Sequence, residues 1–204
     1  MSSISVCILD YGSGNVNSVF NILQHMNYQA VISNDEDQIK KCSHIILPGV
    51  GSFGSAMNKI LSKIPIRVLE DEVIKYKKPI LGICVGMQIF ANKGFENGIF
   101  DGLGWIKGKV EKLKSGNLSL PHIGWNNIKV NSDSKILMNI SDNDFYFLHS
   151  YVFKPESNNN IIANTVYGEK FCSVINENNI FGTQFHPEKS QKAGIQLIKN
   201  FLSN

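Results

Sequence analysis

The chain has 204 residues, of which 43% are hydrophobic and 18% are charged, and its formal net charge is +3. This length and composition are typical of a globular protein with a sizeable core, and we expect residues 1–204 to form a single domain. The small net charge, without blocks of like charge, argues against nucleic acid as the main ligand, and no apolar run approaches the ~20 residues that span a bilayer.

The first half of the chain alternates short apolar runs with helical patterns. Strands are predicted over 5–12, 30–33, 44–54 and 79–84, and helices over 15–29 and 55–78, the latter with a break at Pro65. Strands that alternate with helices predict parallel βαβ units, in which ligands gather at the carboxyl ends of the strands. The glycine-rich turn that ends 44–54 and the turn at Cys84 both belong to that edge.

The second half is predicted to contain shorter, mostly antiparallel strands. Four of them lie in the segments GWIKGKVEKL, HIGWNNIKV, DFYFLHSYVF and NIIANTVYG. The segment FCSVINENNIFGTQFHPE predicts a hairpin that turns near Asn178 and Asn179, and ESNNNI (156–161) predicts an exposed turn. The last residues, 190–204, have the apolar spacing of an amphipathic helix. The expected fold class is α/β, with a mostly parallel sheet and an antiparallel extension.

The four cysteines indicate a reducing compartment. Cys7, Cys42, Cys84 and Cys172 are widely spaced and form neither a CxxC pair nor a zinc pattern. The start of the chain, MSSISVCILDYG, lacks the basic residues of a signal peptide. We therefore expect a cytoplasmic protein, and no metal or organic cofactor is implied.

The segment KKPILGICVGMQIF (77–90) joins a strand to a helix at one cysteine. Gly82, Cys84 and Gly86 have the spacing of a nucleophile elbow, with cysteine in place of serine. In such a turn the glycines leave room for the tight backbone, and the helix N-terminus favours a thiolate. The alternative is a buried structural cysteine, since free cysteine is among the most buried residue types.

A nucleophilic cysteine needs a base, and His186 is the best of five histidines. It follows an apolar strand, Pro187 stiffens the turn, and Glu188 lies two residues on. In extended backbone, residues two apart project to the same side, so Glu188 is expected to orient the His186 ring. The alternative is a surface turn with a solvated glutamate. His25 is expected on the surface of the first helix and His44 is expected to be structural.

An acyl-transfer site also needs donors for an oxyanion, and the segment LPGVGSFG (47–54) supplies a glycine-rich backbone at the same sheet edge. The alternatives are a phosphate-cradling loop or a simple turn. A Walker loop is not indicated, because the lysine of GxxxxGK[ST] is missing, and GxG alone is weak evidence for a dinucleotide site.

Taken together, PGVGSFG, GICVGMQ and HPEKS, in this order, resemble the motifs of the class I glutamine amidotransferases. That resemblance implies a three-layer α/β sandwich with a Cys-His-Glu triad. One branch of the family matches over essentially the whole chain: the glutaminase subunit of imidazole glycerol phosphate synthase. The segments that carry this closer resemblance are DYGSGNVNSV (10–19), PHIGWNNI (121–128), YFLHSY (146–151) and HPEKSQ (186–191).

The resemblance implies a role for each matching residue. Cys84 would attack the side-chain amide of glutamine, His186 would move the proton, and Glu188 would hold His186. The oxyanion hole would use the N–H of Val85 and the backbone of Gly49, Val50 and Gly51, and the family's loop needs reorientation to complete it. The residues that match glutamine-binding positions are Gln88, Glu96, His149 and Ser150.

A glutaminase fold would use all 204 residues, so we expect the ammonia to pass to a partner chain. The resemblance implies that this partner is a (β/α)8-barrel cyclase, in a heterodimer with a shielded ammonia path, and that the two form imidazole glycerol phosphate and aminoimidazole carboxamide ribotide in histidine biosynthesis. Glutaminase activity is then expected to be low in the isolated chain and raised by the partner. The matching interface positions are Pro121, Ile123, Trp125, Tyr146 and Lys189. For Trp125, a place in the core is the alternative.

Three alternatives to this function remain open at the level of sequence. The same chemistry serves sugar amidination in surface-polysaccharide synthesis. Another cysteine hydrolase of this fold, such as a γ-glutamyl hydrolase or a small peptidase, would use the same nucleophile. A non-catalytic interaction protein would keep only the docking face, and the intact set of Cys84, His186 and Glu188 argues against it.

Overall fold

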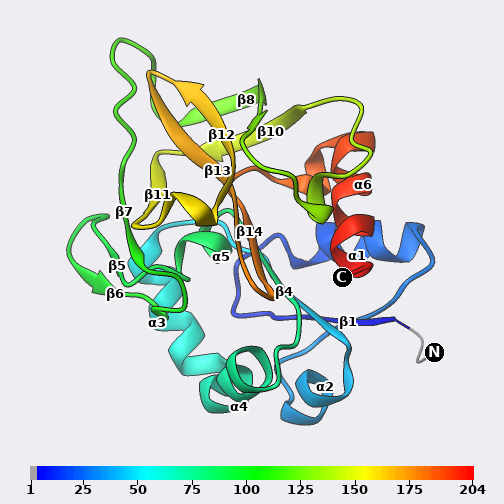
Figure 1. The fold of residues 1–204 in the computed structure, drawn as a ribbon. Helices are drawn as coiled ribbons and strands as arrows, with labels where there is room; N and C mark the ends of the chain where they lie inside the picture. Colours follow the sequence, from blue (N-terminus) through cyan, green and yellow to red (C-terminus); the bar gives the residue numbers. More distant parts are fainter. Residues whose placement is uncertain (1–3) are drawn as a thin grey trace.

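The computed structural model describes residues 4–204 as a large sheet between helices, with two smaller sheets beside it (Figure 1). In order across the large sheet, the strands are β2 (Gln29–Ile32), β1 (Ser5–Ile8), β3 (His44–Leu47), β4 (Ile80–Ile83), β14 (Ile180–Thr183), β13 (Glu169–Glu177), β12 (Ile161–Tyr167) and β9 (Lys129–Val130). The first five are parallel and the last three continue antiparallel. The expected α/β fold with an antiparallel extension is confirmed.

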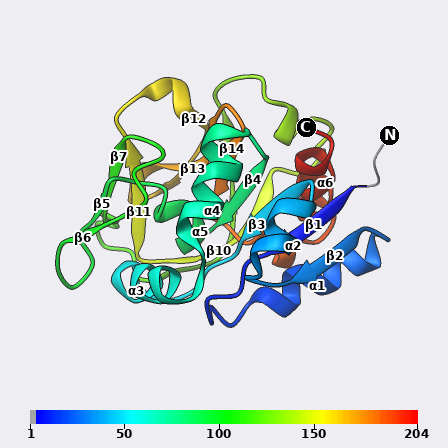
Figure 2. The same ribbon diagram turned by 90° about the horizontal axis from the view of Figure 1, so that it is seen from below.

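Helices cover both faces of the parallel part. They are α1 (Val16–His25), α2 (Glu36–Lys41), α3 (Phe53–Lys63), α4 (Ile66–Glu70), α5 (Val85–Gln88) and α6 (Gln191–Leu202). In Figures 1 and 2, α2 and α4 lie on one side of β1 and β4, and α1 and α6 lie on the other. Strands covered on both faces should be apolar throughout, and β3 and β4 are fully buried. The three-layer arrangement follows.

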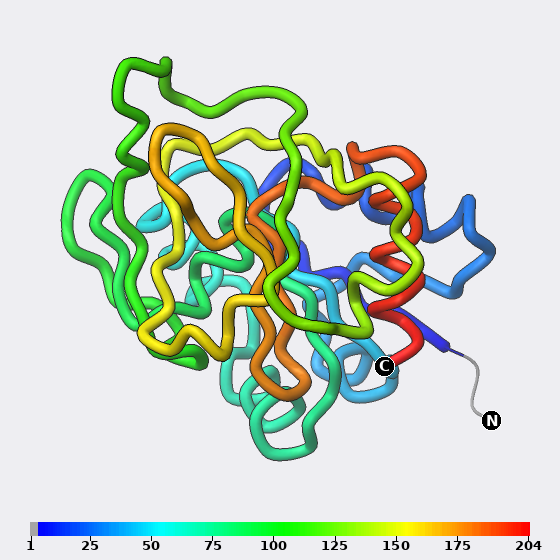
Figure 3. The backbone as a smooth tube through the Cα atoms, turned by 45° about the horizontal axis from the view of Figure 1, so that its top comes forward, coloured from blue at the N-terminus to red at the C-terminus, as the bar shows by residue number. Residues whose placement is uncertain are grey.

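The last helix, α6, packs on the side of the molecule where the chain begins. In Figure 3, α6 (red) lies on the same side as the first strand and helix (blue). Its Phe201 packs edge-on against His44 at 5.3 Å between ring centroids and against Phe181 at 5.7 Å. His44 is thus a core residue at the start of β3, as expected, and His25 is exposed on α1. Between residues 4 and 204, no helix has the length and apolarity to cross a membrane.

The helical segment predicted over 55–78 is divided into three pieces. A break at Pro65 separates α3 from α4, because proline has no N–H for the helix ladder. A π-helical turn, η1 (Asp71–Lys75), follows α4 directly. Helix α2 was not predicted, because only one of its six residues is buried and its sequence therefore has no repeat of apolar residues at helical spacing. Its formation is explained by Asp35, whose side chain accepts hydrogen bonds from two N–H groups of the first turn.

One apolar run predicted as a single strand serves two sheets. β10 (Asp144–His149) pairs with β8 (His122–Asn127), and β11 (Tyr151–Pro155) pairs with β7 (Gly108–Lys112), so the run changes sheets at Ser150. The short strands β5 (Lys93–Gly94) and β6 (Phe100–Asp101) complete the second small sheet. Three 3₁₀ turns complete the elements: η2 (Lys135–Leu137), η3 (Asn158–Asn160) and η4 (Pro187–Lys189). The predicted hairpin at Asn178 is confirmed by the antiparallel pairing of β13 with β14.

Strand register brings distant segments to one edge. β4 and β14 are parallel neighbours in which Ile83 lies opposite Thr183, so the residues that follow, Cys84 and Gln184, leave the sheet together. β3 is the other neighbour of β4, and the glycine-rich turn follows it. The carboxyl edge of the sheet therefore collects the segments in which the sequence predicted a site.

Candidate active site

Cys84 lies in a strained turn between β4 and α5. Its φ is 56° and its ψ is −110°. Residues other than glycine rarely adopt this backbone conformation, and a nucleophile elbow uses it to present its reactive atom. The glycines fit the tight turn. A Cβ on Gly82 would lie 2.5 Å from the carbonyl oxygen of Gly86, and a Cβ on Gly86 would collide with the carbonyl oxygen of Leu47. The backbone thus has the elbow geometry expected from the spacing.

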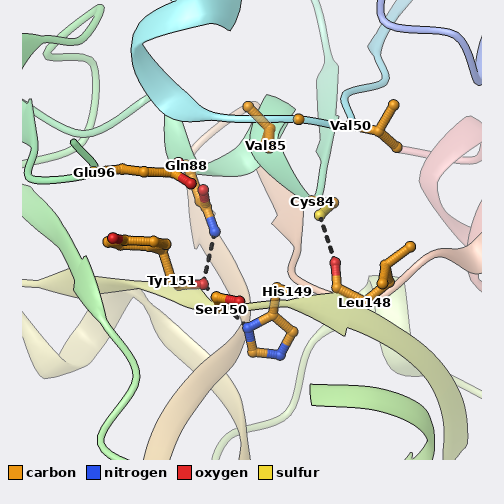
Figure 4. Close-up of a pocket in the computed structure, with 10 residues that line it drawn as sticks. Val50, Cys84, Val85, Gln88, Glu96, Leu148, His149, Ser150 and Tyr151 are labelled. Carbon is orange, nitrogen blue, oxygen red and sulfur yellow. Dashed lines mark hydrogen bonds between the residues drawn. The ribbon is translucent and has the colours of Figure 1, made fainter. Parts of the chain in front are cut away.

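Two contacts hold the thiol of Cys84. Sγ donates to the carbonyl oxygen of Leu148 at 3.7 Å, which Figure 4 shows, and accepts from Nε2 of Gln184 at 3.7 Å. Gln184 is fully buried and also accepts a hydrogen bond of 3.0 Å from Gln88. The sequence pattern alone does not single out Gln184. Its one signal is its place directly after β14, beside the strand that ends at Cys84.

His186 and Glu188 form a buried pair. Nδ1 of His186 lies 2.8 Å from Oε1 of Glu188, and both side chains are completely buried. The two side chains were expected to meet because extended backbone places residues two apart on the same side, but the backbone between them is not extended. Pro187 begins the 3₁₀ turn η4, and this turn brings the carboxylate under the ring. A surface turn with a solvated glutamate is therefore wrong.

Asn15 completes the environment of Glu188. Its Nδ2 donates to Oε1 of Glu188 at 3.0 Å, and Ser13 holds the Asn15 side chain at 3.1 Å. Burial alone would raise the pKa of Glu188, but the hydrogen bond and charge of His186, together with the hydrogen bond from Asn15, hold it below its ordinary value. Asn15 comes from the start of the chain, 173 residues away from Glu188, and no local pattern indicates this contact.

The charge state of His186 follows from its neighbours. Burial would lower its pKa, but the neighbouring Cys84 and the hydrogen-bonded Glu188 raise the pKa to about 10. Among residues 4–204, Nε2 of His186 has no hydrogen-bond partner of ordinary geometry. When Cys84 gives its proton to His186, the imidazolium and thiolate form the pair that a cysteine nucleophile requires, and Nε2 is the atom free to exchange this proton with a substrate.

A small cavity of about 90 Å³ opens beside Cys84 (Figure 4). Its lining residues are Val50, Gly51, Cys84, Val85, Gln88, Glu96, Leu148, His149, Ser150 and Tyr151. All four positions expected to bind glutamine are in this set. One carboxylate oxygen of Glu96 is fixed, because Oε2 accepts a hydrogen bond of 2.8 Å from the N–H of Phe53 at the start of α3. The cavity therefore combines a carboxylate, an amide and main-chain groups around a nucleophile.

The residues expected to form the oxyanion hole lie on two sides of the elbow. Val50 and Gly51 line the cavity, and the φ of Gly51 is 106°. Gly49 lies deeper, where a Cβ would be 2.7 Å from the nitrogen of Gly86. Val85 is the first residue of α5, so its N–H has no acceptor within the helix. Val85, Val50 and Gly51 thus line the same cavity.

The residues expected at a partner interface gather around β8 and β10. Trp125 is 46% exposed and Ile123 is 58% exposed, so a place for Trp125 in the core is wrong. The Trp125 ring packs edge-on against Tyr146 at 6.1 Å, and Nζ of Lys189 lies 5.7 Å from the Tyr146 ring centroid. We call Trp125, Tyr146 and Lys189 the aromatic patch. Pro121 is exposed on the chain leading into β8.

The arrangement is suited to acyl transfer from a small amide. It contains a thiol at a strained elbow, a histidine oriented by a carboxylate, and N–H groups next to the thiol. In the part of the chain that the structure describes, no three His, Cys, Asp or Glu side chains are placed to hold a metal ion. All four cysteines, Cys84 included, are buried free thiols.

Comparison with known proteins agrees with this chemistry. The family model described as "Glutamine amidotransferase class-I" matches residues 7–204. The chain is 48% identical over 202 residues to "Imidazole glycerol phosphate synthase subunit HisH" of Leptospira interrogans, covering 96% of this chain and 98% of that protein. It is 42% identical over 199 residues to "Imidazole glycerol phosphate synthase subunit HisH 2" of Methanococcus maripaludis, covering 97% and 98%.

Solved structures share the fold at lower identity. A structure titled as PurLQS from Thermotoga maritima has a TM-score of 0.75 at 19% identity and covers 98% of both chains. Another structure, titled as a glutamine amidotransferase, has a TM-score of 0.74 at 15% identity and covers 97% of both chains. At this identity the likeness supports the fold alone.

Proposed function

Because this chain belongs to the class I glutamine amidotransferase family, we propose that it is the glutaminase subunit of an imidazole glycerol phosphate synthase. It hydrolyses glutamine and delivers the ammonia to a (β/α)8-barrel cyclase in histidine biosynthesis. The observation that carries the proposal is the Cys84 elbow beside the buried His186–Glu188 pair. The full-length similarity to curated subunits of that synthase supports the choice of pathway. One continuous buried core supports a single glutaminase domain.

In the proposed reaction, Sγ of Cys84 attacks the side-chain amide carbon of glutamine. His186 holds the thiol proton on Nε2 and gives it to the departing nitrogen, so ammonia leaves and a glutamyl thioester remains. Water then attacks the thioester carbon, His186 accepts a proton from that water and returns it to the thiolate, and glutamate is released. Glu188 keeps the His186 ring in place and stabilises its positive charge throughout.

The transition states carry negative charge on the amide oxygen. The N–H of Val85 is one donor for this oxygen, and an N–H of the Gly49–Gly51 segment is the second. Removing one such donor costs about 3 kcal/mol of barrier stabilisation. Because these are main-chain groups, the position of the segment decides whether the hole is complete. Movement of the 49–51 segment is therefore the step at which a partner controls the rate.

Glutamine binding is assigned to the cavity residues. The Glu96 carboxylate binds the substrate ammonium group with the oxygen that Phe53 does not occupy. The side chain of Gln88 and the main chain of His149 and Ser150 supply donors and acceptors to the rest of the amino acid. A pocket with a fixed carboxylate favours a free amino acid over the interior of a peptide chain, since only the former has the ammonium group.

The ammonia needs a shielded route, because the free molecule is lost to solvent and largely protonated at neutral pH. We assign the docking of the barrel subunit to the aromatic patch together with Pro121 and Ile123. Exposed aromatic side chains at the centre of a contact are typical anchors. The patch is close to the nucleophile in the fold, since Leu148, whose carbonyl accepts from Cys84, follows Tyr146 by two residues on β10.

The test is glutamate release from glutamine with and without a co-expressed barrel subunit in the presence of its nucleotide ligand. Strong stimulation by the barrel subunit is the expected result. Full activity of the isolated chain would leave the Cys84 chemistry intact and overturn the control by the partner. If only the barrel subunit of a sugar-amidinating pathway stimulates release, the chain belongs to that pathway, and the assignment to histidine biosynthesis is wrong. No release with either partner would contradict the glutaminase assignment.

A further inference from the structure

Two more buried histidines link the cavity to strand β8. His122 on β8 and His149 on β10 are opposite each other in the strand register, and Nδ1 of His122 lies 3.1 Å from Nε2 of His149. Both side chains are buried. His149 lines the cavity, and His122 does not. The proposed reaction uses neither ring as an acid or base, so their contact needs another explanation.

The contacts determine which nitrogen of each ring carries the hydrogen. Nδ1 of His149 lies 3.1 Å from the carbonyl oxygen of Tyr151, which can only accept, so Nδ1 is protonated. In a neutral ring, Nε2 of His149 is then the acceptor, and Nδ1 of His122 must donate to it. Nε2 of His122 is left as an acceptor, and Nδ2 of Asn126 donates to it at 3.2 Å. Each ring has one tautomer that satisfies its partners.

The surroundings keep both rings neutral. His122 stacks on Tyr167 at 4.0 Å and on Phe147 at 4.9 Å between ring centroids. Burial lowers the pKa of His122 to about 4. Burial, the neighbouring His122 and the charge of His186 lower the pKa of His149 to about 3. At neutral pH the direction of the hydrogen bonds is therefore fixed, and protonation of either ring would remove an acceptor from the chain.

The chain of hydrogen bonds continues from His149 to the nucleophile. The carbonyl oxygen of Tyr151 accepts from His149 and also from Nε2 of Gln88 at 2.9 Å (Figure 4). Gln88 in turn contacts Oε1 of Gln184, and Nε2 of Gln184 donates to Sγ of Cys84. The side chain of Gln88, a proposed glutamine ligand, is thus held on one side by a carbonyl that His149 also binds.

We propose that His122 is a positioning residue for the glutamine pocket: its Nδ1–H locks His149 in the tautomer that holds the Tyr151 carbonyl and, through it, Gln88. This role rests on the proposed glutaminase function. Strand β8 also carries Trp125 of the aromatic patch, so one strand presents the docking residue to solvent and the clamping histidine to His149. A partner that shifts β8 changes the alignment of Gln88 through this clamp.

The test compares His122→Phe with His122→Asn. Phenylalanine keeps the stacked ring and leaves Nε2 of His149 without a donor, whereas the side-chain amide of asparagine supplies an N–H close to the place of Nδ1. In the complex with the barrel subunit, we expect H122F to raise the KM for glutamine about tenfold while kcat changes by less than about twofold. H122N should restore a KM near that of the unchanged protein.

Two controls separate the clamp from a general packing effect. His44→Phe makes the same replacement at a buried histidine outside the chain of contacts, and it should leave the KM unchanged. Nitrogen NMR of ¹⁵N-labelled histidine should show His149 with Nδ1 protonated and Nε2 as an acceptor, and H122F should shift the Nε2 signal, because Nε2 loses its donor. An unchanged KM and an unchanged His149 signal in H122F would overturn the proposal. If the unmodified complex releases no glutamate, the proposed function fails, and the NMR result still decides the tautomer lock.

Discussion

The main-chain N–H of His186 donates a hydrogen bond of 2.9 Å to the carbonyl oxygen of Tyr146. The N–H of Tyr146 donates in turn to Oγ of Ser190 at 3.0 Å, and the same hydroxyl donates to the carbonyl oxygen of His186 at 2.6 Å. These three bonds join the proposed base to a residue of the aromatic patch within one closed set of contacts. A partner that displaces the main chain of Tyr146 would therefore also displace His186. This coupling gives a physical reason to expect stimulation of the glutaminase reaction by a docked partner.

Cys84→Ala should abolish glutamate release, by about 10⁴-fold or more, because the thioester cannot form. Binding of the barrel subunit should be nearly unchanged, since the Cys84 side chain is buried and the aromatic patch is outside the cavity. Release measured with the barrel subunit, next to the dissociation constant of the complex, checks both statements. Loss of binding in this variant would show that the separation of catalytic and docking residues is wrong.

Glu188→Gln should lower the pKa of His186 from about 10, because it removes a carboxylate that raises this pKa. The active pair needs the imidazolium, so the alkaline limb of the kcat/KM profile should move to lower pH. Glu169→Gln, at a carboxylate that contacts Lys154 away from the cavity, is the matched control and should leave the limb in place. An alkaline limb that does not move in E188Q would mean that Glu188 does not set the charge of His186.

Gly86→Ala should destabilise the protein by about 3 kcal/mol or prevent folding, because the new Cβ would collide with the Leu47 carbonyl oxygen at the centre of the sheet. Gly116→Ala is the comparison, since a Cβ there meets no atom within 4 Å and the cost is limited to the strain of a φ of 61°, about 1 kcal/mol. Urea unfolding of both variants gives the difference. Equal losses would contradict the close packing of the elbow.

Trp125→Ala should weaken binding of the barrel subunit by about 2 kcal/mol, or about thirtyfold in Kd, while the stability of the isolated chain changes little. Tyr76→Ala is the control, because Tyr76 is an aromatic residue that is 62% exposed just before β4, at the opposite edge of the sheet from Cys84. Titration of the barrel subunit by calorimetry measures both. Equal effects of the two variants would show that the aromatic patch is not the dock.

The free energy of unfolding should fall as the pH drops from about 6.5 toward 4. The pKa of His122 is near 6.5 in the unfolded chain and about 4 in the folded protein, so the unfolded state takes up the proton first and is favoured by acid. His149 extends the loss to about pH 3. His186 acts oppositely: its raised pKa adds stability that is fully present below 6.5 and is lost as the pH rises through about 10.

Urea unfolding at pH 7 and pH 5 checks this assignment. H122F should show a smaller difference in free energy of unfolding between the two pH values than the unmodified protein, because one of the buried neutral histidines is gone. H44F is again a useful comparison, since burial also lowers the pKa of His44 and its loss should reduce the difference in the same direction. A pH dependence identical in all three proteins would contradict the buried neutral state of these rings.

Much of the fold could be predicted because it rests on local patterns. The short apolar runs that became β1, β3 and β4 are continuous, and the apolar residues of α6 recur with a helical period. Helix α2 escaped because its formation depends on the Asp35 cap rather than on an apolar stripe. The division of 144–155 between two sheets escaped because nothing in that run distinguishes residues that pair with β8 from residues that pair with β7.

The sequence by itself determined the elbow, the order of its motifs and the identity of the family, since glycine spacing and residue type are local properties. Only the tertiary structure decided which side chains meet. Asn15 reaches Glu188 across 173 positions, and Gln184 reaches Cys84 across 100, because parallel strands bring their carboxyl ends to one edge whatever lies between them. The hydrogen-bond direction between His122 and His149 was likewise set by the fold, since a ring's tautomer depends on the partners that packing supplies.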